Sequence, residues 1–168
     1  RGGQADDVIA FDVGPANALI DGVVAIFSEG RESMDRDGAR ARRGQVDEAL
    51  LTRLLDDEFL SRPPPKSTGR ERYGTEQAET LVRESRSEGQ ADDDLVATLV
   101  AFTAEAIAHA QRDFLDGTVE RLLVGGGGVE NPALMDALGA AMPDVPIVAF
   151  DEVGVPARAA EAMAFALM

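Results

Sequence analysis

The sequence is poor in the residues from which redox and metal sites are most often built. Its 168 residues include no cysteine and one histidine, His109. The lack of cysteine excludes disulfide bonds and thiolate metal sites, and it leaves the redox compartment undetermined. A metal site made of several histidines of one chain is excluded as well, because only one is present.

Positive charge is also scarce. Lysine and arginine number 16 against 31 acidic residues, the formal net charge is -15, and Lys66 is the only lysine. Nonspecific binding to nucleic acid or to an anionic membrane needs clustered positive charge, so we expect neither partner. An anionic ligand would have to be held by local dipoles, by a few basic side chains or by a metal.

Long apolar runs are missing too. None approaches membrane-spanning length, and the first six residues, RGGQAD, lack the apolar core of a secretory signal. We therefore expect a soluble, cytoplasmic protein. The sequence begins without methionine and reaches its first apolar run almost at once, so we also expect a fragment of a longer protein.

What the sequence does contain is an alternation of short apolar runs and helical periods, typical of an α/β domain with a partly parallel sheet. The runs predict strands at residues 8–11, 122–124 and 147–150. The helical periods predict helices at residues 19–29, 46–59, 75–87, 92–114, 131–138 and 160–167. Residues 31–43 show no apolar period and are interpreted as a solvated connection.

Residues 7–21, DVIAFDVGPANALID, join the first expected strand to a turn and a helix. An acid at the carboxyl end of a buried strand faces the crevice in which α/β sheets bind ligands, and the following helix N-terminus favours anions. Asp12 is therefore the first candidate for catalysis. The alternative is that Asp12 only caps a turn, which is a common use of aspartate.

A second candidate is the run of four glycines that follows the strand at 122–124. A strand, a glycine turn and a helix that starts at Asn131 can cradle a phosphate, because the backbone is unobstructed and the helix offers free amides. The run lacks both the lysine of a Walker sequence and the spacing of the dinucleotide fingerprint. A flexible turn without a ligand is the alternative.

A third candidate is the loop at 63–71, PPPKSTGRE, whose prolines would present Lys66 and Arg70 from a stiff approach. The alternative is a surface loop in which Ser67 or Thr68 caps the next turn. His109 lies within the long helix predicted at 92–114, and nothing in the sequence supplies a catalytic partner for it.

Five segments, in order, resemble the anhydro-N-acetylmuramic acid kinase family. They are FDVGPANALID at 11–21, MDRDGARARRGQVDEALL at 34–51, PPKSTGRE at 64–71, RLLVGGGGVENPALM at 121–135 and DEVGVPARAAEAMAFALM at 151–168. In the second segment, Asp35, Gly38, Ala41 and Gly44 take the positions of the family's D-x-x-G-x-x-A-x-x-G run. Val13 stands where the family usually has threonine, and Glu130 where it has histidine.

The resemblance implies an actin-like ATPase (ribonuclease H-like) fold, in which two related domains clasp the nucleotide. The family's N-terminal phosphate loop, G-x-M-S-G-T-S-x-D-G, is absent. We therefore expect that residues 1–168 are the C-terminal nucleotide- and sugar-binding domain of a two-domain sugar kinase, incomplete at its N-terminus, with the N-terminal domain absent.

The implied reaction is ATP-dependent opening of 1,6-anhydro-N-acetylmuramic acid with phosphorylation of its 6-oxygen, a step in peptidoglycan recycling, with Mg²⁺ bridging the phosphates. By resemblance, Asp12 activates the attacking water. The nucleotide-binding residues implied are Gly14, Gly125, Gly126, Gly127, Gly128 and Asn131. The substrate-binding residues implied are Asn17, Lys66, Arg70 and Glu161.

Two alternatives stay open at this point. Glu161 is also compatible with an ordinary solvated position on the last helix. The chain as a whole is compatible with a noncatalytic nucleotide- or sugar-binding module, for which the glycine turn would suffice without Asp12. The sequence also leaves a homodimer open.

Overall fold

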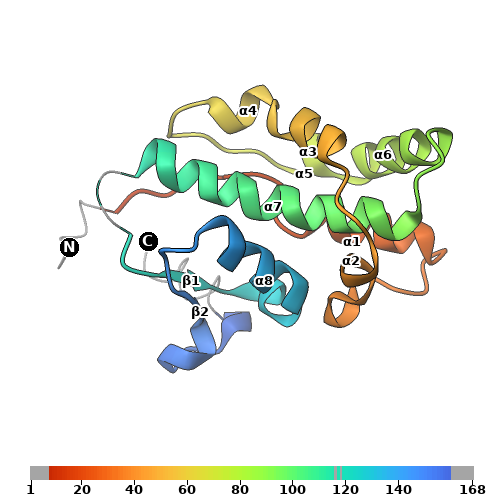
Figure 1. Ribbon diagram of the computed structural model, residues 1–168. Helices are drawn as coiled ribbons and strands as arrows, with labels where there is room; N and C mark the ends of the chain where they lie inside the picture. The colour runs from red at the N-terminus through yellow and green to blue at the C-terminus, as the bar shows by residue number, and fades with distance from the viewer. Residues whose placement is uncertain (1–7, 116, 118, 160–168) are drawn as a thin grey trace.

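The computed structural model describes residues 8–115, 117 and 119–159 as an α/β chain with many helices and a small parallel sheet (Figure 1). The α-helices are α1 (Ala18–Phe27), α2 (Ala39–Arg43), α3 (Glu48–Leu55), α4 (Glu58–Ser61), α5 (Arg70–Tyr73), α6 (Thr75–Ser87), α7 (Asp92–Phe114) and α8 (Pro132–Ala141). The strands are β1 (Leu122–Val124) and β2 (Ile147–Ala149). Short 3₁₀ helices are η2 (Arg36–Gly38), η3 (Gly126–Glu130), η4 (Phe150–Val153) and η5 (Ala157–Ala159). The helix predicted at 160–167 lies outside the described residues.

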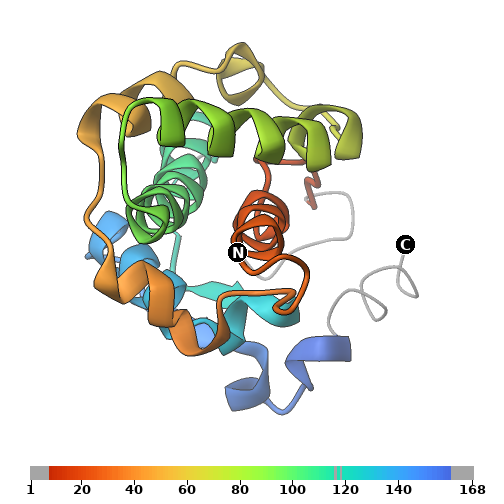
Figure 2. The ribbon, with the colours of Figure 1, turned by 90° about the vertical axis from the view of Figure 1, so that its right-hand side faces the viewer.

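The long helix α7 is the centre of the core, as its wide apolar stripe predicts. It contacts α1, α2, α3, α6 and α8. Leu95, Leu99 and Phe102 on α7 are at most 1% exposed. Figure 2 shows α6 crossing above α1 and α7, which lie side by side beneath it. Within the described residues, none of the helices is both long and apolar enough to cross a membrane.

The sheet is a parallel pair in which Leu122, Leu123 and Val124 face Ile147, Val148 and Ala149. α8 connects the two strands, so β1, α8 and β2 form a β–α–β unit, as the sequence predicted. α8 starts sharply because the side chain of Asn131 accepts hydrogen bonds from the backbone N–H of Ala133 and Leu134. The end of β1 and the start of α8 therefore stand on either side of the glycine run.

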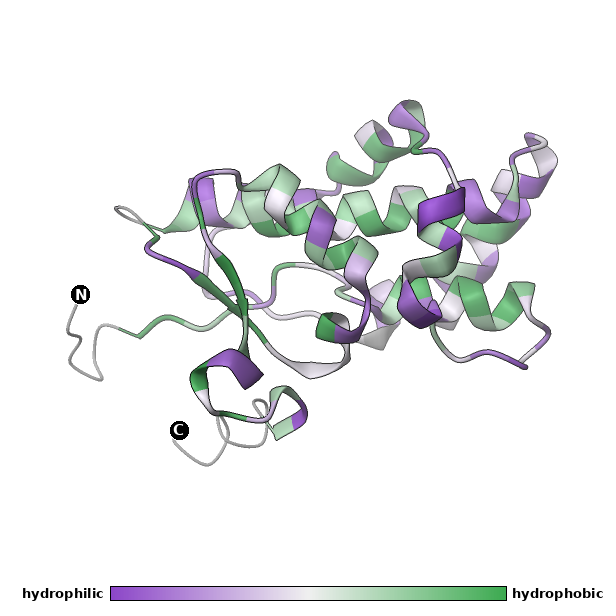
Figure 3. Cartoon of the chain, turned by 60° about the horizontal axis from the view of Figure 1, so that its bottom comes forward, coloured by the Kyte–Doolittle hydropathy of each residue, from purple (hydrophilic) through white to green (hydrophobic). Residues whose placement is uncertain are grey.

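The strand predicted at 8–11 is not formed. Val8 and Ile9 are 74% and 57% exposed, and the segment is extended chain, largely green in Figure 3 where it leaves the grey N-terminal trace. A strand needs a neighbour to accept its backbone hydrogen bonds, and the described residues offer it none. The segment instead runs along α7 in the opposite direction, with Phe11 edge-on to Phe114 at a centroid distance of 5.8 Å.

The helix predicted at 46–59 is also wrong as one element, because two aspartates start separate helices within it. Asp47 Oδ1 accepts hydrogen bonds from Ala49 N and Leu50 N at 2.9 Å and caps α3. Asp57 Oδ1 accepts one from Phe59 N at 2.9 Å and caps α4. The cap at Asp57 changes the direction of the chain, which lets Phe59 and Leu60 enter the core.

Residues 31–43, which we predicted to be a solvated connection, contain the helical turns η2 and α2. Asp35 is 4% exposed, and its two carboxylate oxygens accept hydrogen bonds from Arg40 N and Ala41 N, which begins α2. Gly38 has a φ of +64°, and a Cβ on it would lie 2.6 Å from Ala133 Cβ. A Cβ on Gly44 would lie 2.0 Å from the carbonyl oxygen of Asp93. The two glycines therefore let α2 approach α8 and α7.

Gly44→Ala is expected to destabilise the fold by about 1–3 kcal/mol, because the added methyl group overlaps the backbone of α7. The conformation of Gly44 is extended, with a φ of -77°, so the loss would be steric and not conformational. Urea unfolding measures it. The matched control is Gly139→Ala on α8, where a Cβ meets nothing within 4 Å and should be neutral or slightly stabilising. Equal unfolding midpoints for Gly44→Ala and the unmutated chain would contradict the prediction.

Candidate functional site

Asp12 is held by a loop that lies more than fifty positions away in the sequence. Its Oδ2 accepts hydrogen bonds from Ser67 Oγ at 2.9 Å and from the backbone N–H of Thr68 at 2.8 Å. Its own backbone N–H donates to the carbonyl oxygen of Lys66 at 3.0 Å. One carboxylate oxygen is therefore anchored by the loop, and within the described part of the chain Oδ1 has no hydrogen-bond donor. These bonds join Asp12 to a loop distant in the sequence instead of to its own turn.

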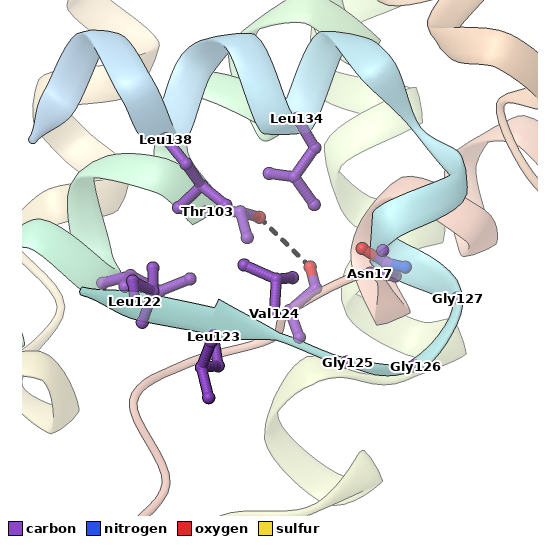
Figure 4. Close-up of a pocket in the computed structure, with 13 residues that line it drawn as sticks. Asn17, Thr103, Leu122, Leu123, Val124, Gly125, Gly126, Gly127, Leu134 and Leu138 are labelled. Carbon is purple, nitrogen blue, oxygen red and sulfur yellow. Dashed lines mark hydrogen bonds between the residues drawn. The ribbon is translucent and has the colours of Figure 1, made fainter. Parts of the chain in front are cut away.

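A hydrogen bond from α7 fixes the turn that follows Asp12. Ala16 has a φ of +46°, which costs a residue other than glycine about 1 kcal/mol. Its carbonyl oxygen accepts a hydrogen bond from Thr103 Oγ1 at 3.1 Å (Figure 4). The same hydroxyl lies 2.9 Å from the carbonyl oxygen of Leu99. Thr103 is 3% exposed. A buried hydroxyl on the core helix therefore secures the turn that leads to Asn17.

The glycine run at 125–128 lines a cavity of about 370 Å³ between β1, α7 and α8 (Figure 4). Gly126 has a φ of +75°, which favours glycine, and the run continues into η3. A Cβ on Gly127 would meet nothing nearer than the Asn17 amide nitrogen at 4.0 Å, and one on Gly128 would lie 3.6 Å from that amide. The turn and the Asn17 side chain thus face each other with open space at Gly127.

A second hollow, of about 280 Å³, adjoins the first on the side of Asp12. Residues 11–16 line it, and it shares Ala16, Thr103 and Ile107 with the cavity at the glycine turn. Asp12 and the glycine turn therefore line neighbouring hollows that have three lining residues in common. Gly14 lines this second hollow, but a Cβ on it would point at Leu60 and Ala106 rather than into open space.

Asn131 and Glu130 lie at the far end of the glycine turn. Asn131 is 8% exposed, and its side-chain oxygen caps α8, so it supports the turn from the helix. The carboxylate of Glu130 pairs with Arg158, with Oε1 2.6 Å from Nη2. The pair is exposed and is worth about 0.2–1 kcal/mol. It connects the glycine turn to η5.

Lys66 does not extend toward either hollow, in contrast to the expectation of a presented lysine. It is 8% exposed, and its ammonium donates to the carbonyl oxygens of Phe59 at 3.1 Å and Leu60 at 2.8 Å. The nitrogen also lies 4.6, 5.0 and 5.9 Å from the ring centroids of Phe114, Phe59 and Phe11. The three rings and the two carbonyl oxygens of the short helix α4 thus surround the cation.

The surroundings of Lys66 also shift its proton affinity. Burial lowers the pKa of Lys66, because an apolar environment disfavours the charged form, and the nearby charge of Arg62 lowers it further. Asp113 acts in the opposite direction. The two carbonyl oxygens and three rings compensate the cation directly, so the ammonium is a satisfied part of the structure.

The structure places none of the other candidate side chains, those of Arg70, Glu161 and His109, in the two hollows. The side chain of Arg70 and all of Glu161 lie outside the described residues. His109 is half-exposed on α7, and its Nε2 lies 3.9 Å from Glu105 Oε2, one helical turn earlier. Within residues 8–115, 117 and 119–159, no three histidine or acidic side chains gather to hold a metal ion.

Sequence reasoning missed the contacts of Ser67, Thr68 and Thr103. The segment PPKSTGRE gave a hint, since it placed two hydroxyl residues next to Lys66. The pairing of this segment with Asp12 is a tertiary contact across 55 and 56 positions, which no local pattern carries. Thr103 lies within an apolar helix, where its hydroxyl also bonds within the helix and gives no separate signal.

Comparison with known proteins agrees with the five segments. The family model described as "Anhydro-N-acetylmuramic acid kinase" matches residues 4–168. A protein of that name from Caldanaerobacter subterraneus subsp. tengcongensis is 38% identical over 170 residues, which cover all of this chain and 43% of the relative.

Two further relatives of the same name match this chain to a similar extent. The one from Streptomyces coelicolor is 43% identical over 95% of this chain and 40% of its own length. The one from Gloeobacter violaceus is 43% identical over 99% of this chain and 43% of its own length. The chain thus spans about two fifths of the length of these relatives. Because the match covers almost every residue, the chain belongs to the anhydro-N-acetylmuramic acid kinase family.

Proposed function

We propose that the chain is the nucleotide- and sugar-binding domain of a two-domain kinase that opens 1,6-anhydro-N-acetylmuramic acid and phosphorylates its 6-oxygen. The observation that carries the proposal is that the anchored carboxylate of Asp12 and the glycine turn line neighbouring hollows, which share Ala16, Thr103 and Ile107. A kinase that also splits a glycosidic bond needs these two functions side by side. The proposal includes an actin-like ATPase fold and a cytoplasmic role in peptidoglycan recycling.

Asp12 is the proposed general base. In the reaction a water molecule attacks the anomeric carbon, and the bond from that carbon to the 6-oxygen breaks. The 6-oxygen takes the γ-phosphoryl group of ATP, and ADP is the leaving group. The carboxylate of Asp12 would take the proton of the water through Oδ1, while Oδ2 stays bonded to Ser67 and Thr68. Fixing one oxygen in this way sets the direction of the other.

The glycine turn is the proposed place of the nucleotide. The open space at Gly127 lets the ligand approach the backbone, and the Asn17 amide faces the same space. Asn131 keeps the N-terminus of α8 in place behind the turn. Mg²⁺ in kinases is held largely by the substrate phosphates, and we assign none of the described residues to it.

A nucleotide-binding turn without catalysis is the second candidate, because the turn is complete without Asp12. Calorimetric titration of the chain with ATP and with the anhydro sugar tests binding. A turnover assay in a chain of the relatives' full length then tests chemistry. Binding of both ligands with no sugar-dependent ADP release in the longer chain would favour the binding module over the kinase.

Gly127→Val is expected to weaken ATP binding at least tenfold and to leave the affinity for the sugar unchanged, because the side chain fills the approach to the turn. Isothermal titration calorimetry measures both affinities. Gly127 suits this test better than Gly126, whose positive φ would add backbone strain. Gly139→Val, at a position where a Cβ meets nothing within 4 Å, is the matched control. An unchanged ATP affinity in a folded Gly127→Val chain would contradict a nucleotide at this turn.

A further inference from the structure

The only lysine of the chain is buried beside the loop that holds Asp12, and it lines neither of the two hollows. A lysine that served only to fill space could be replaced by an apolar residue, since three aromatic rings surround it. The ammonium adds what an apolar side chain lacks, which is two hydrogen bonds to the last turn of α4. These bonds tie the loop that follows the prolines to a fixed point of the core.

The same residue reaches Asp12 from two directions. The carbonyl oxygen of Lys66 accepts the backbone N–H of Asp12, and its ammonium lies over the ring of Phe11, the residue just before Asp12. The next two residues, Ser67 and Thr68, donate both hydrogen bonds that Oδ2 accepts. The position of Lys66 therefore affects both the backbone and the carboxylate of Asp12.

We infer that Lys66 is a positioning residue, which fixes residues 66–68 and thereby holds the carboxylate of Asp12 in place at the hollow lined by residues 11–16. Lys66 touches no reacting atom in this arrangement. The inference rests on the proposed role of Asp12 as the general base, and it adds the means by which that base is oriented. Ser67 donates the one side-chain hydrogen bond from this loop to Asp12. A threonine at position 67 keeps that hydroxyl group, and an alanine removes it.

The first experiment needs no turnover and uses the chain itself. Hydrogen exchange is followed at the amides of Asp12 and Thr68, which bond to Lys66 O and Asp12 Oδ2. Lys66→Met, which keeps length and apolar packing, should speed exchange at both amides at least tenfold. The amide of Leu122, bonded to Pro146 O, serves as the internal control and should not change. Unchanged exchange at Asp12 and Thr68, or an equal increase at Leu122, overturns the inference.

The second experiment measures kinetics in a chain of the relatives' full length. Lys66→Met should lower kcat at least tenfold and leave KM for ATP and for the sugar unchanged, because neither ligand meets the lysine. Ser67→Ala should lower kcat, and Ser67→Thr, which keeps the hydroxyl, should restore most of it. In an Asp12→Asn background, Lys66→Met should cause no further loss, since both changes remove the same function.

The outcomes separate this inference from the proposed function. If Asp12→Asn retains turnover, the proposed base is wrong, and the exchange experiment still decides whether Lys66 holds the loop. If Asp12→Asn is inactive but Lys66→Met keeps its kcat, or raises KM instead, the positioning inference alone is wrong. A further loss from Lys66→Met in the Asp12→Asn background also overturns it, because that result assigns Lys66 an independent role.

Discussion

Asp12→Asn, made in a chain of the relatives' full length, is expected to lower kcat by roughly 10²–10⁴-fold and to leave ATP binding close to normal. An asparagine cannot take a proton from water, so the fall in kcat measures the contribution of Asp12 as a base. The amide oxygen can still accept a hydrogen bond from Ser67 or from Thr68 N, which preserves much of the loop. Steady-state assays of sugar-dependent ADP release, with calorimetry for ATP, measure the two effects separately.

Asp144→Asn is the matched control for this substitution. Asp144 is exposed in the connection between α8 and β2, away from the lining of both hollows, and the same chemical change there should leave kcat unchanged. Near-normal turnover in Asp12→Asn would contradict its assignment as the base. A parallel fall in ATP affinity would instead indicate that the substitution disturbs the shared surface at Ala16, and Asp12 would then be structural.

Local sequence patterns predicted the parts of the fold that are decided locally. α6 and α7 have the predicted bounds, and β1, α8 and β2 follow the predicted order, because their apolar periods and caps lie within a few residues. The run at 8–11 has the same strand pattern as β1, yet it is not a strand. Pairing decides between the two cases: β1 has β2 beside it, whereas 8–11 has no neighbour among the described residues.

The candidate site was predicted in its parts and not in its assembly. Asp12 and the glycine run were identified from their positions after apolar runs and by resemblance. The place of Lys66 was not predicted, because its environment comes from Phe11, Phe59 and Phe114, three residues spread over more than a hundred positions. Local patterns report periodicity and turns, and they carry no information on which distant rings will surround a cation.

The 168-residue chain assayed alone is expected to show no sugar-dependent release of ADP. It spans about two fifths of the length of its relatives, and phosphoryl transfer depends on charge stabilisation and positioning from both sides of the nucleotide. The described residues supply the carboxylate of Asp12 and the glycine turn. The chain should nevertheless bind ATP weakly, since the cavity at the turn is formed by its own residues.

A coupled assay of ADP release from the purified chain, with and without the anhydro sugar, tests this expectation. The full-length relative from Streptomyces coelicolor is the positive control, and the remaining part of that relative, added as a separate polypeptide, should restore turnover if the two pieces dock. Val8 and Ile9 are exposed apolar residues on chain that pairs with no strand among the described residues, so light scattering should accompany the assay to detect association. Robust sugar-dependent release from the 168-residue chain alone would show that the groups needed for phosphoryl transfer all lie within it, and the proposed division into two domains would then be wrong.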